Sequence, residues 1–243
     1  MDITLLTEDK DPMGSAVYDY FKQGKAARLR VFSSQFEEDE IPVKDLFRSY
    51  EEMPLLEQKA LQLAEGKILD VGAGSGCHTL ALRKMGKEAL AIDISPWSVK
   101  VMEARGLTAR QVNLFDERFT ERFDTILMLM NGSGIIGRLE RMGDFFRRIR
   151  QLLNQILMDS SDLRYLFEDE DGSYLVNLAG NYYGEIDFRM QYKQVKGDSF
   201  DWLYVDFDTL SAYAAQCGFR AECIQEGSHY DYLARLTVTD EAL

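Results

Sequence analysis

Three glycines at alternate positions, Gly72, Gly74 and Gly76, follow the acid Asp70 in the stretch KILDVGAGSG. The apolar run before Asp70 is typical of a buried strand, and residues 77–85 after the last glycine are typical of a helix. A strand, a tight glycine turn and a helix in that order present the N–H groups of a helix N-terminus to a nucleotide-like ligand. The spacing therefore predicts a ligand-binding turn.

The charge of Asp70 indicates which ligand this turn would bind. Dinucleotide-binding folds usually space their glycines as G-x-G-x-x-G, and their backbone amides meet a pyrophosphate. Here the spacing is G-x-G-x-G, and a carboxylate at the end of the strand would repel a pyrophosphate. It suits a ligand with a cationic amine and a sulfonium, such as S-adenosylmethionine (AdoMet), whose methionine part can lie close to glycine backbone. A purely structural strand-to-helix turn is the alternative interpretation of these residues.

Polar residues also end each of the next predicted strands. Residues 89–92 lead into Asp93, about twenty residues after the glycine turn, where an acid can accept hydrogen bonds from both ribose hydroxyls. Residues 109–112 lead into Asn113, and the strand at 123–130 leads into Asn131. Open α/β sheets bind ligands at the carboxyl ends of their strands. We therefore expect these side chains along one edge of a sheet.

The motif DVGAGSG of residues 70–76 resembles the first motif of the class I AdoMet-dependent methyltransferases, and Asp93 matches their ribose-binding acid. Asn113 falls where that family places an Asp or Asn near the adenine amino group, and the amide of Leu114 would be a second adenine contact. The resemblance is clear over about residues 60–160 and weaker over 207–243. It implies AdoMet as cofactor, bound by Asp70, Gly72, Ala73, Gly74, Gly76, Asp93, Ile94, Asn113, Leu114, Met130 and Asn131.

The same resemblance implies an α/β fold, a doubly wound, Rossmann-like, mostly parallel sheet of seven strands with a C-terminal antiparallel hairpin. We expect one domain over residues 1–243, with an N-terminal helical lid at about 1–60 and a core at about 61–163 and 207–243. A β-hairpin insertion is predicted at about 173–206. Residues 15–31 are expected to be helical, and residues 209–217 form a predicted helix with Asp208 as its N-cap.

Family members often use such a lid to cover AdoMet and to shape the substrate pocket. By that resemblance Tyr20, Arg48 and Tyr50 are candidate substrate contacts, although simple packing explains aromatic residues equally well. The acceptor is predicted to be a small, partly apolar molecule, because the lid and the insertion are rich in aromatic residues. The signature of methyltransferases for exocyclic base amines, Asn or Asp before Pro-Pro-aromatic, is missing after Asn131.

The expected chemistry is a displacement at the sulfonium methyl, in which the protein mainly aligns the reacting atoms, an effect worth roughly 7–11 kcal/mol. A general base is needed only if the acceptor must lose a proton. The candidates are His229, because imidazole side chains suit proton transfer in proteins, and Asp159, at the end of the predicted strand 154–158. A surface-loop histidine is the alternative interpretation of His229.

Composition and charge disfavour several classes of protein and of site. The net charge of −13 disfavours a nucleic-acid substrate, and the arginines at 138–150 have the helical spacing of a solvated face. The chain has no apolar run of 18 residues and no signal-peptide pattern at its start, and its three cysteines are too scattered for disulfides or a metal site. We therefore expect a cytoplasmic monomer or homodimer without a metal.

Two other functions use the same features. The first is a non-catalytic AdoMet-binding protein, because a fold can keep its ligand site after catalysis is lost. The second is a NAD-dependent oxidoreductase on the same kind of sheet, which the glycine spacing and Asp70 oppose.

Overall fold

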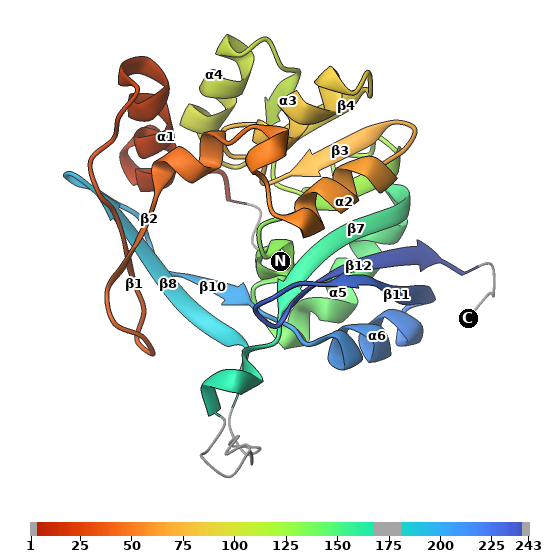
Figure 1. The fold of residues 1–243 in the computed structure, drawn as a ribbon. Coiled ribbons are helices and arrows are strands. Elements are labelled where there is room, and N and C mark those ends of the chain that lie inside the picture. The colour runs from red at the N-terminus through yellow and green to blue at the C-terminus, as the bar shows by residue number, and fades with distance from the viewer. Residues whose placement is uncertain (1–3, 168–180, 240–243) are drawn as a thin grey trace.

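Two β-sheets organise the chain in the computed structural model, which describes residues 4–167 and 181–239 (Figure 1). The larger sheet has seven strands in the order β11-β12-β7-β6-β3-β4-β5. Strands β3 to β7 are parallel, whereas β12 is antiparallel to both β7 and β11. The predicted fold class is confirmed. These strands are β3 (Ile68–Val71), β4 (Ala89–Asp93), β5 (Ala109–Gln111), β6 (Phe123–Met128), β7 (Leu153–Ser161), β11 (Phe219–Glu226) and β12 (Asp231–Val238).

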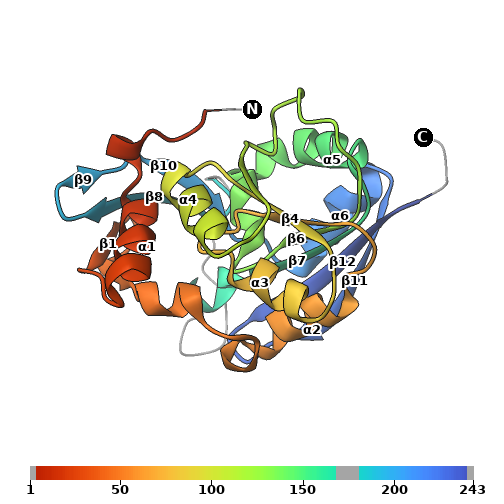
Figure 2. The ribbon, with the colours of Figure 1, turned by 90° about the horizontal axis from the view of Figure 1, so that it is seen from above.

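Helices cover both faces of this sheet, as Figure 2 shows from above. Ile68 packs under α2 and α3 while its neighbour Leu69 packs on the opposite side, so β3 is apolar at consecutive positions, as expected for a parallel strand buried on both faces. Within residues 4–167 and 181–239, no helix has the length and apolarity needed to cross a membrane. One face carries α2 (Leu55–Leu63), α3 (Cys77–Lys84) and α4 (Pro96–Ala104), and the other carries α5 (Met142–Arg150) and α6 (Phe207–Gln216).

The N-terminal segment is less helical than predicted. Helix α1 (Pro12–Gln23) ends at Gly24, whose φ of +69° is the left-handed conformation that favours glycine, so the prediction of a helix over 15–31 is wrong beyond Gln23. The chain continues as β1 (Leu29–Phe32) and β2 (Asp39–Ile41). Short 3-10 helices complete the described chain: η1 (Glu8–Lys10), η2 (Val43–Phe47), η3 (Tyr50–Glu52), η4 (Gly132–Ile136), η5 (Leu139–Arg141) and η6 (Leu163–Phe167).

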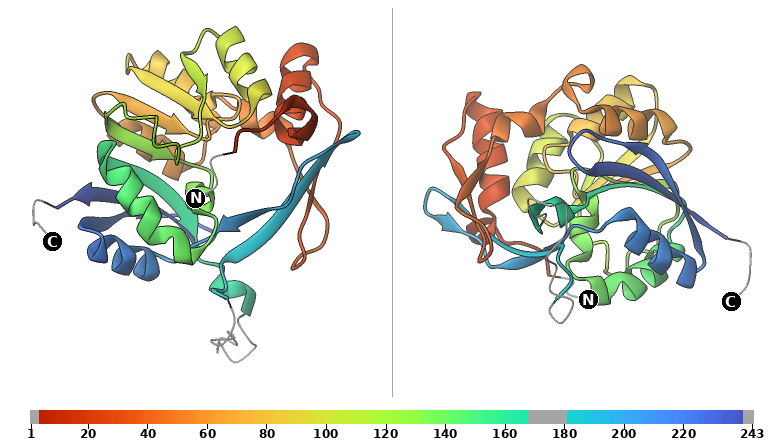
Figure 3. Two further views of the ribbon diagram at one scale, coloured as in Figure 1. Left: turned by 180° about the vertical axis from the view of Figure 1, so that it is seen from behind. Right: turned by 60° about the horizontal axis from the view of Figure 1, so that its bottom comes forward.

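The second sheet joins two distant parts of the sequence. Strand β1 pairs with β2 on one side and with β8 (Glu185–Tyr192) on the other, and β8 also pairs with β9 (Val195–Lys196) and β10 (Phe200–Leu203), all antiparallel. The segment predicted as a lid and the segment predicted as an insertion therefore share one sheet, which stands beside α1 (Figures 1 and 3). Residues 173–180 of the predicted insertion lie outside the described residues.

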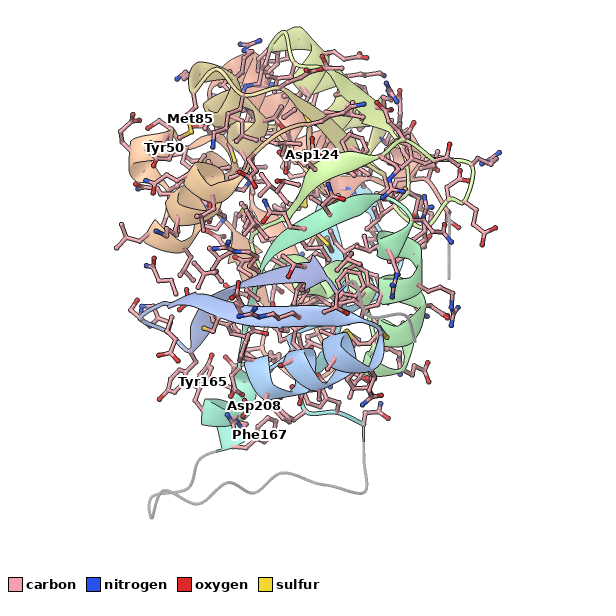
Figure 4. All side chains as sticks on the ribbon, turned by 90° about the vertical axis from the view of Figure 1, so that its right-hand side faces the viewer. Tyr50, Met85, Asp124, Tyr165, Phe167 and Asp208 are labelled. Atoms are coloured by element: carbon pink, nitrogen blue, oxygen red, sulfur yellow. The ribbon has the colours of Figure 1, made fainter. Side chains whose placement is uncertain are left out.

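The cap of α6 is not the predicted one. Asp206 is the N-cap, and its Oδ1 accepts a hydrogen bond from the Thr209 N–H at 2.9 Å. Asp206 is also bound by the hydroxyl of Tyr182 at 2.6 Å, which holds the carboxylate in place. Asp208 lies two residues further along and is exposed on the surface of α6 (Figure 4). The prediction of Asp208 as the N-cap is therefore wrong, because the cap is Asp206.

The prediction of a solvated arginine face on α5 is wrong for Arg148. Its side chain is buried, and its guanidinium donates to three backbone carbonyls, those of Leu114 and Asp116 at 2.8 Å and Phe119 at 2.5 Å. These carbonyls belong to the stretch between β5 and β6, where no helix makes the crossover. In a helix these carbonyls would accept hydrogen bonds from backbone N–H groups. Here Arg148 donates to them instead, so the stretch can pack over the core without unpaired carbonyls at these three positions.

We predict that Arg148→Met lowers the free energy of unfolding by about 2–4 kcal/mol, because two buried carbonyls and one half-buried carbonyl lose a charged donor. Arg147→Met is the matched control, since Arg147 is exposed and pairs with the exposed Asp144, and it should change stability by no more than about 0.5 kcal/mol. Urea denaturation followed by circular dichroism measures both. Equal effects of the two substitutions would contradict this account of the loop.

Candidate functional site

The glycine turn lies at the carboxyl end of β3, between β3 and α3. Its three glycines have φ values of +67°, +56° and +79°, and Gly72 N donates to Ile92 O of β4 at 2.9 Å. A Cβ on Gly76 would lie 2.6 Å from Leu107, so that glycine allows α3 to pack against its neighbours. At Gly74 no atom lies within 4 Å of the Cβ position. Gly74 is therefore the point at which the turn has open space for a ligand.

Asp93, at the tip of β4, is bound directly to this turn. Its Oδ2 accepts a hydrogen bond from Gly74 N at 2.8 Å, and its Oδ1 accepts one from Ser95 N at 2.9 Å. Burial outweighs these two donors and raises the pKa of the Asp93 carboxyl to about 6. The structure thus brings together the two strongest predicted cofactor contacts, the open glycine and the acid of the following strand.

Asp70 lies beneath the turn. Its carboxylate is buried and accepts a hydrogen bond from the Thr79 hydroxyl of α3 at 2.5 Å. Burial raises the pKa of Asp70 above its usual range, against the lowering effect of His78 and Thr79. Because Asp70 lies beneath the turn, the predicted attraction between its carboxylate and a cationic ligand would act through the backbone of the turn.

Residues near the N-terminus cross the tips of β4 and β5. Leu6 N donates to Ile94 O at 3.0 Å, and the Gln111 amide donates to the carbonyls of both Leu6, at 3.0 Å, and Ile94, at 2.9 Å. Asn113 donates to Thr4 O at 3.2 Å and accepts from Phe115 N at 3.0 Å. The chain start thus lies against the residues predicted to bind adenine. The predicted lid at about 1–60 includes this segment, but sequence reasoning assigned it no contact with these residues, because it has no helical or strand periodicity.

The turn after β6 is held in an unusual backbone conformation. Met130 and Asn131 have φ values of +68° and +57°, which is rare for residues with a side chain and is common at functional sites. Asp159 of β7 accepts hydrogen bonds from Met130 N at 3.1 Å and from Gly132 N at 3.0 Å, and Ser161 donates to the Asn131 side chain at 2.7 Å. Burial raises the pKa of Asp159 to about 6. The carboxyl predicted as a base thus also fixes this turn.

The other predicted base, His229, lies in the exposed loop between β11 and β12. Its backbone N donates to Asp231 Oδ1 at 2.9 Å. This loop lies at the same edge of the sheet as the glycine turn, but it is three strands away from β3, which corresponds to about 14 Å. The structure does not bring His229 and the glycine turn together.

The three predicted substrate contacts are separated. The hydroxyl of Tyr50 accepts a hydrogen bond from Gln62 at 2.8 Å, and Tyr50 lies beside Met85 at the C-terminal end of α3, away from the glycine turn (Figure 4). Tyr20 packs against Phe47, with ring centroids 4.8 Å apart, and belongs to the cluster under the second sheet. Neither position adds support to a substrate role. Only Arg48 reaches the neighbourhood of the turn.

Arg48 belongs to a buried ionic cluster next to the glycine turn. Its guanidinium pairs with Glu57 of α2, and Glu57 binds Nε2 of His78, in the first turn of α3, at 2.7 Å. Burial lowers the pKa of His78, but the hydrogen bond to Glu57 and the charge of Asp70 outweigh it, so the net shift is upward. The cluster attaches the N-terminal segment to the helix that starts at the turn, and no sequence pattern predicted it.

Two surface hollows lie away from this edge. One, of about 320 Å³, is lined by Glu65, Asp124, Asn154, Gln155 and Thr237 at the amino edge of the sheet, where Figure 4 marks Asp124. The other, of about 360 Å³, lies between the end of α1 and β2 and includes Tyr20 and Lys44. Neither hollow contains a predicted cofactor contact.

Comparison with known proteins gives one family. The model of a methyltransferase domain matches residues 68–155, which run from β3 into β7. An uncharacterized methyltransferase of Staphylococcus carnosus is 38% identical over 85 residues, 35% of this chain, and the match spans only 40% of that relative's length.

Solved structures extend the similarity to the whole chain. A SAM-dependent methyltransferase from Bacteroides fragilis, crystallised with S-adenosyl-L-homocysteine, is 69% identical, with a TM-score of 0.93 over 98% of this chain and 99% of its own. The CcbJ methyltransferase from Streptomyces caelestis has a TM-score of 0.62 over 96% of this chain and 100% of its own at 12% identity, which shows a shared fold alone.

We predict that Glu57→Ala lowers the free energy of unfolding by about 3–5 kcal/mol, because Arg48 and His78 would stay buried without their shared partner. Glu103→Ala on the exposed side of α4 is the control and should cost no more than about 0.5 kcal/mol. Chemical denaturation of both variants at neutral pH is the measurement. A loss at Glu57 no larger than that at Glu103 would show that the cluster does not hold the N-terminal segment.

Proposed function

Because this chain belongs to the S-adenosylmethionine-dependent methyltransferases, we propose that it transfers the methyl group of AdoMet to a small-molecule acceptor. The observation that carries the proposal is the direct hydrogen bond between Gly74 and Asp93, at 2.8 Å, beside the open space over Gly74. It unites the two features that an AdoMet site needs, a backbone free of side chains and a ribose-binding acid.

The residues around this bond fit the cofactor. Gly74 would lie against its methionine part, and the Asp93 carboxylate, already fixed by two N–H groups, would accept hydrogen bonds from the ribose hydroxyls. Ile94, Asn113 and the amide of Leu114 would flank the adenine. Thr4 to Leu6 then lie over that side and would shield it from water.

When bound, the cofactor supplies a methyl group on a positively charged sulfur, already activated for displacement. The task of the protein is to align the acceptor with that carbon. The turn after β6 suits this task because Asp159 and Ser161 hold Met130 to Gly132 in one conformation. With its pKa at about 6, Asp159 is mostly ionised at neutral pH and could accept a proton if the acceptor must lose one.

A small molecule is the acceptor that the charges favour. The net charge of −13 opposes binding to a polyanion, and the aromatic residues of the second sheet provide apolar surface for a compact ligand. Nothing in the site favours a hydride-transfer enzyme or a protein that binds AdoMet without using it.

The test compares two glycines with the same backbone strain. Gly74 and Gly86 both have positive φ and open space around the Cβ position, but only Gly74 lies at the proposed site. Calorimetry should show AdoMet binding that Gly74→Val weakens at least about a hundredfold by steric exclusion, while Gly86→Val binds normally. Transfer of labelled methyl to a metabolite extract should follow the same order. A wild-type protein that is folded but gives no binding heat ends the proposal.

AdoMet binding should also depend on pH through Asp93. Its carboxyl, with a pKa of about 6 before binding, gains a proton as the pH falls, and a neutral carboxyl is a poorer partner for two hydroxyl donors. The dissociation constant should therefore rise roughly tenfold from pH 7 to pH 5. Asp93→Asn should bind more weakly and show no such slope. An identical slope in both proteins would assign the titration to another group.

A further inference from the structure

One face of the second sheet is apolar and looks toward the core of the molecule. The register pairs Ile186 with Trp202 and Phe188 with Phe200, so these side chains share a face with Met190. Met190 packs in the cluster around α1. Since α1 lies between this sheet and α4, the face that α1 covers is the inner one (Figures 1 and 2).

The aromatic part of this face extends beyond the cover of α1. Phe188 and Phe200 have ring centroids 6.2 Å apart, and Phe200 and Trp202 are 6.1 Å apart in an edge arrangement. All three are half-buried, whereas the residues that pack around α1 come from the other end of the sheet. We call Phe188, Phe200 and Trp202 the aromatic wall.

The aromatic wall begins next to the turn after β6. A Cβ on Gly134 would overlap the indole ring of Trp202, so η4 and Trp202 are in direct contact. The next residue, Ile135, places its Cδ1 3.1 Å from the Cβ position of Gly72 in the glycine turn. Consecutive residues of η4 therefore contact the aromatic wall and the glycine turn, so the wall lies close to the proposed methyl-donor site.

The charges of these strands point to the opposite face. Glu185, Asp187, Arg189 and Asp201 alternate with the wall residues and lie on the outer side. The described positions 186, 188, 190, 200 and 202 of the inner face are all uncharged. A phosphate or carboxylate of an acceptor would meet no cationic side chain at these positions. A neutral ring carries no charge, so its transfer from water to this surface has no charge-desolvation cost.

We propose that the aromatic wall binds the methyl acceptor through a neutral, planar aromatic ring of that acceptor. The inference rests on the proposed function, because it takes this face as the acceptor side of the AdoMet site. Edge-to-face and offset contacts with Trp202 and Phe200 favour an aromatic ring over a saturated ring of the same size. The expected preference is about three- to tenfold in affinity.

The experiment uses two neutral hydroxyl compounds with the same carbon skeleton, the planar aromatic 2-naphthol and the saturated decahydro-2-naphthol. Calorimetry on the protein loaded with S-adenosylhomocysteine should give a dissociation constant about three- to tenfold lower for 2-naphthol. Trp202→Leu should abolish this preference, and Phe188→Leu is the second variant because it truncates the wall at its other end. Gly143→Ala on α5, where a Cβ meets nothing within 4 Å, is the control and should keep the preference.

Binding of S-adenosylhomocysteine separates the two proposals. Variants that still bind it are folded at the cofactor site, so their loss of the ring preference supports the aromatic wall. Equal affinity for the two alcohols in the wild type, absence of binding, or a preference that both variants retain overturns the wall and leaves the methyltransferase proposal standing. A wild type that binds neither AdoMet nor S-adenosylhomocysteine overturns both.

Discussion

The hydrogen bond from Gly74 N to the Asp93 carboxylate is the interaction on which the site depends. It exists because Gly74, at a φ of +56°, can turn its N–H toward the neighbouring strand, a conformation costly for any residue with a Cβ. The bond fixes the distance between the ends of β3 and β4 and keeps a carboxylate in a half-buried position, where desolvation raises its pKa to about 6. A hydrogen-bond acceptor is therefore already in place before any ligand arrives, and binding need not order it.

Segments outside the seven-stranded sheet are attached to it by buried charged side chains. Arg148 donates to three carbonyls of the stretch between β5 and β6, and Glu57 joins Arg48 to His78 at the start of α3. Such groups are costly to bury, and each is stable only with its complete set of partners. Directional bonds of this kind fix the stretch after β5 and the N-terminal segment more specifically than apolar packing alone would.

The sequence predicted the parts of the fold whose signals are local. The glycine turn, Asp93 and the individual strands follow from short apolar runs that end in polar residues, and the family resemblance carried by these residues implied the mostly parallel seven-stranded sheet. The strands β1 and β2 were missed because β8, the partner of β1, lies about 160 residues later, and a residue such as Leu29 is compatible with a helix until that partner is known. Arg148 was wrongly predicted to be solvated because its partners, too, are distant in sequence. Helical spacing indicates which residues share a face of α5, but it does not indicate which carbonyls of a neighbouring loop lie against that face. The roles predicted for His229, Asp159 and Arg48 stay predictions.

The division between the two sheets explains why the cofactor was easier to infer than the acceptor. Apart from Met130 and Asn131, the predicted cofactor contacts lie in one stretch, residues 70–114, so a motif can represent them. The proposed acceptor side combines the turn after β6 with strands β8 and β10, and its geometry depends on which residues of these strands face inward. A shift of one residue in that pairing would exchange the aromatic wall for Asp187 and Asp201. Under the proposal, the preference for an acceptor therefore depends on strand register, a property that only the folded chain expresses.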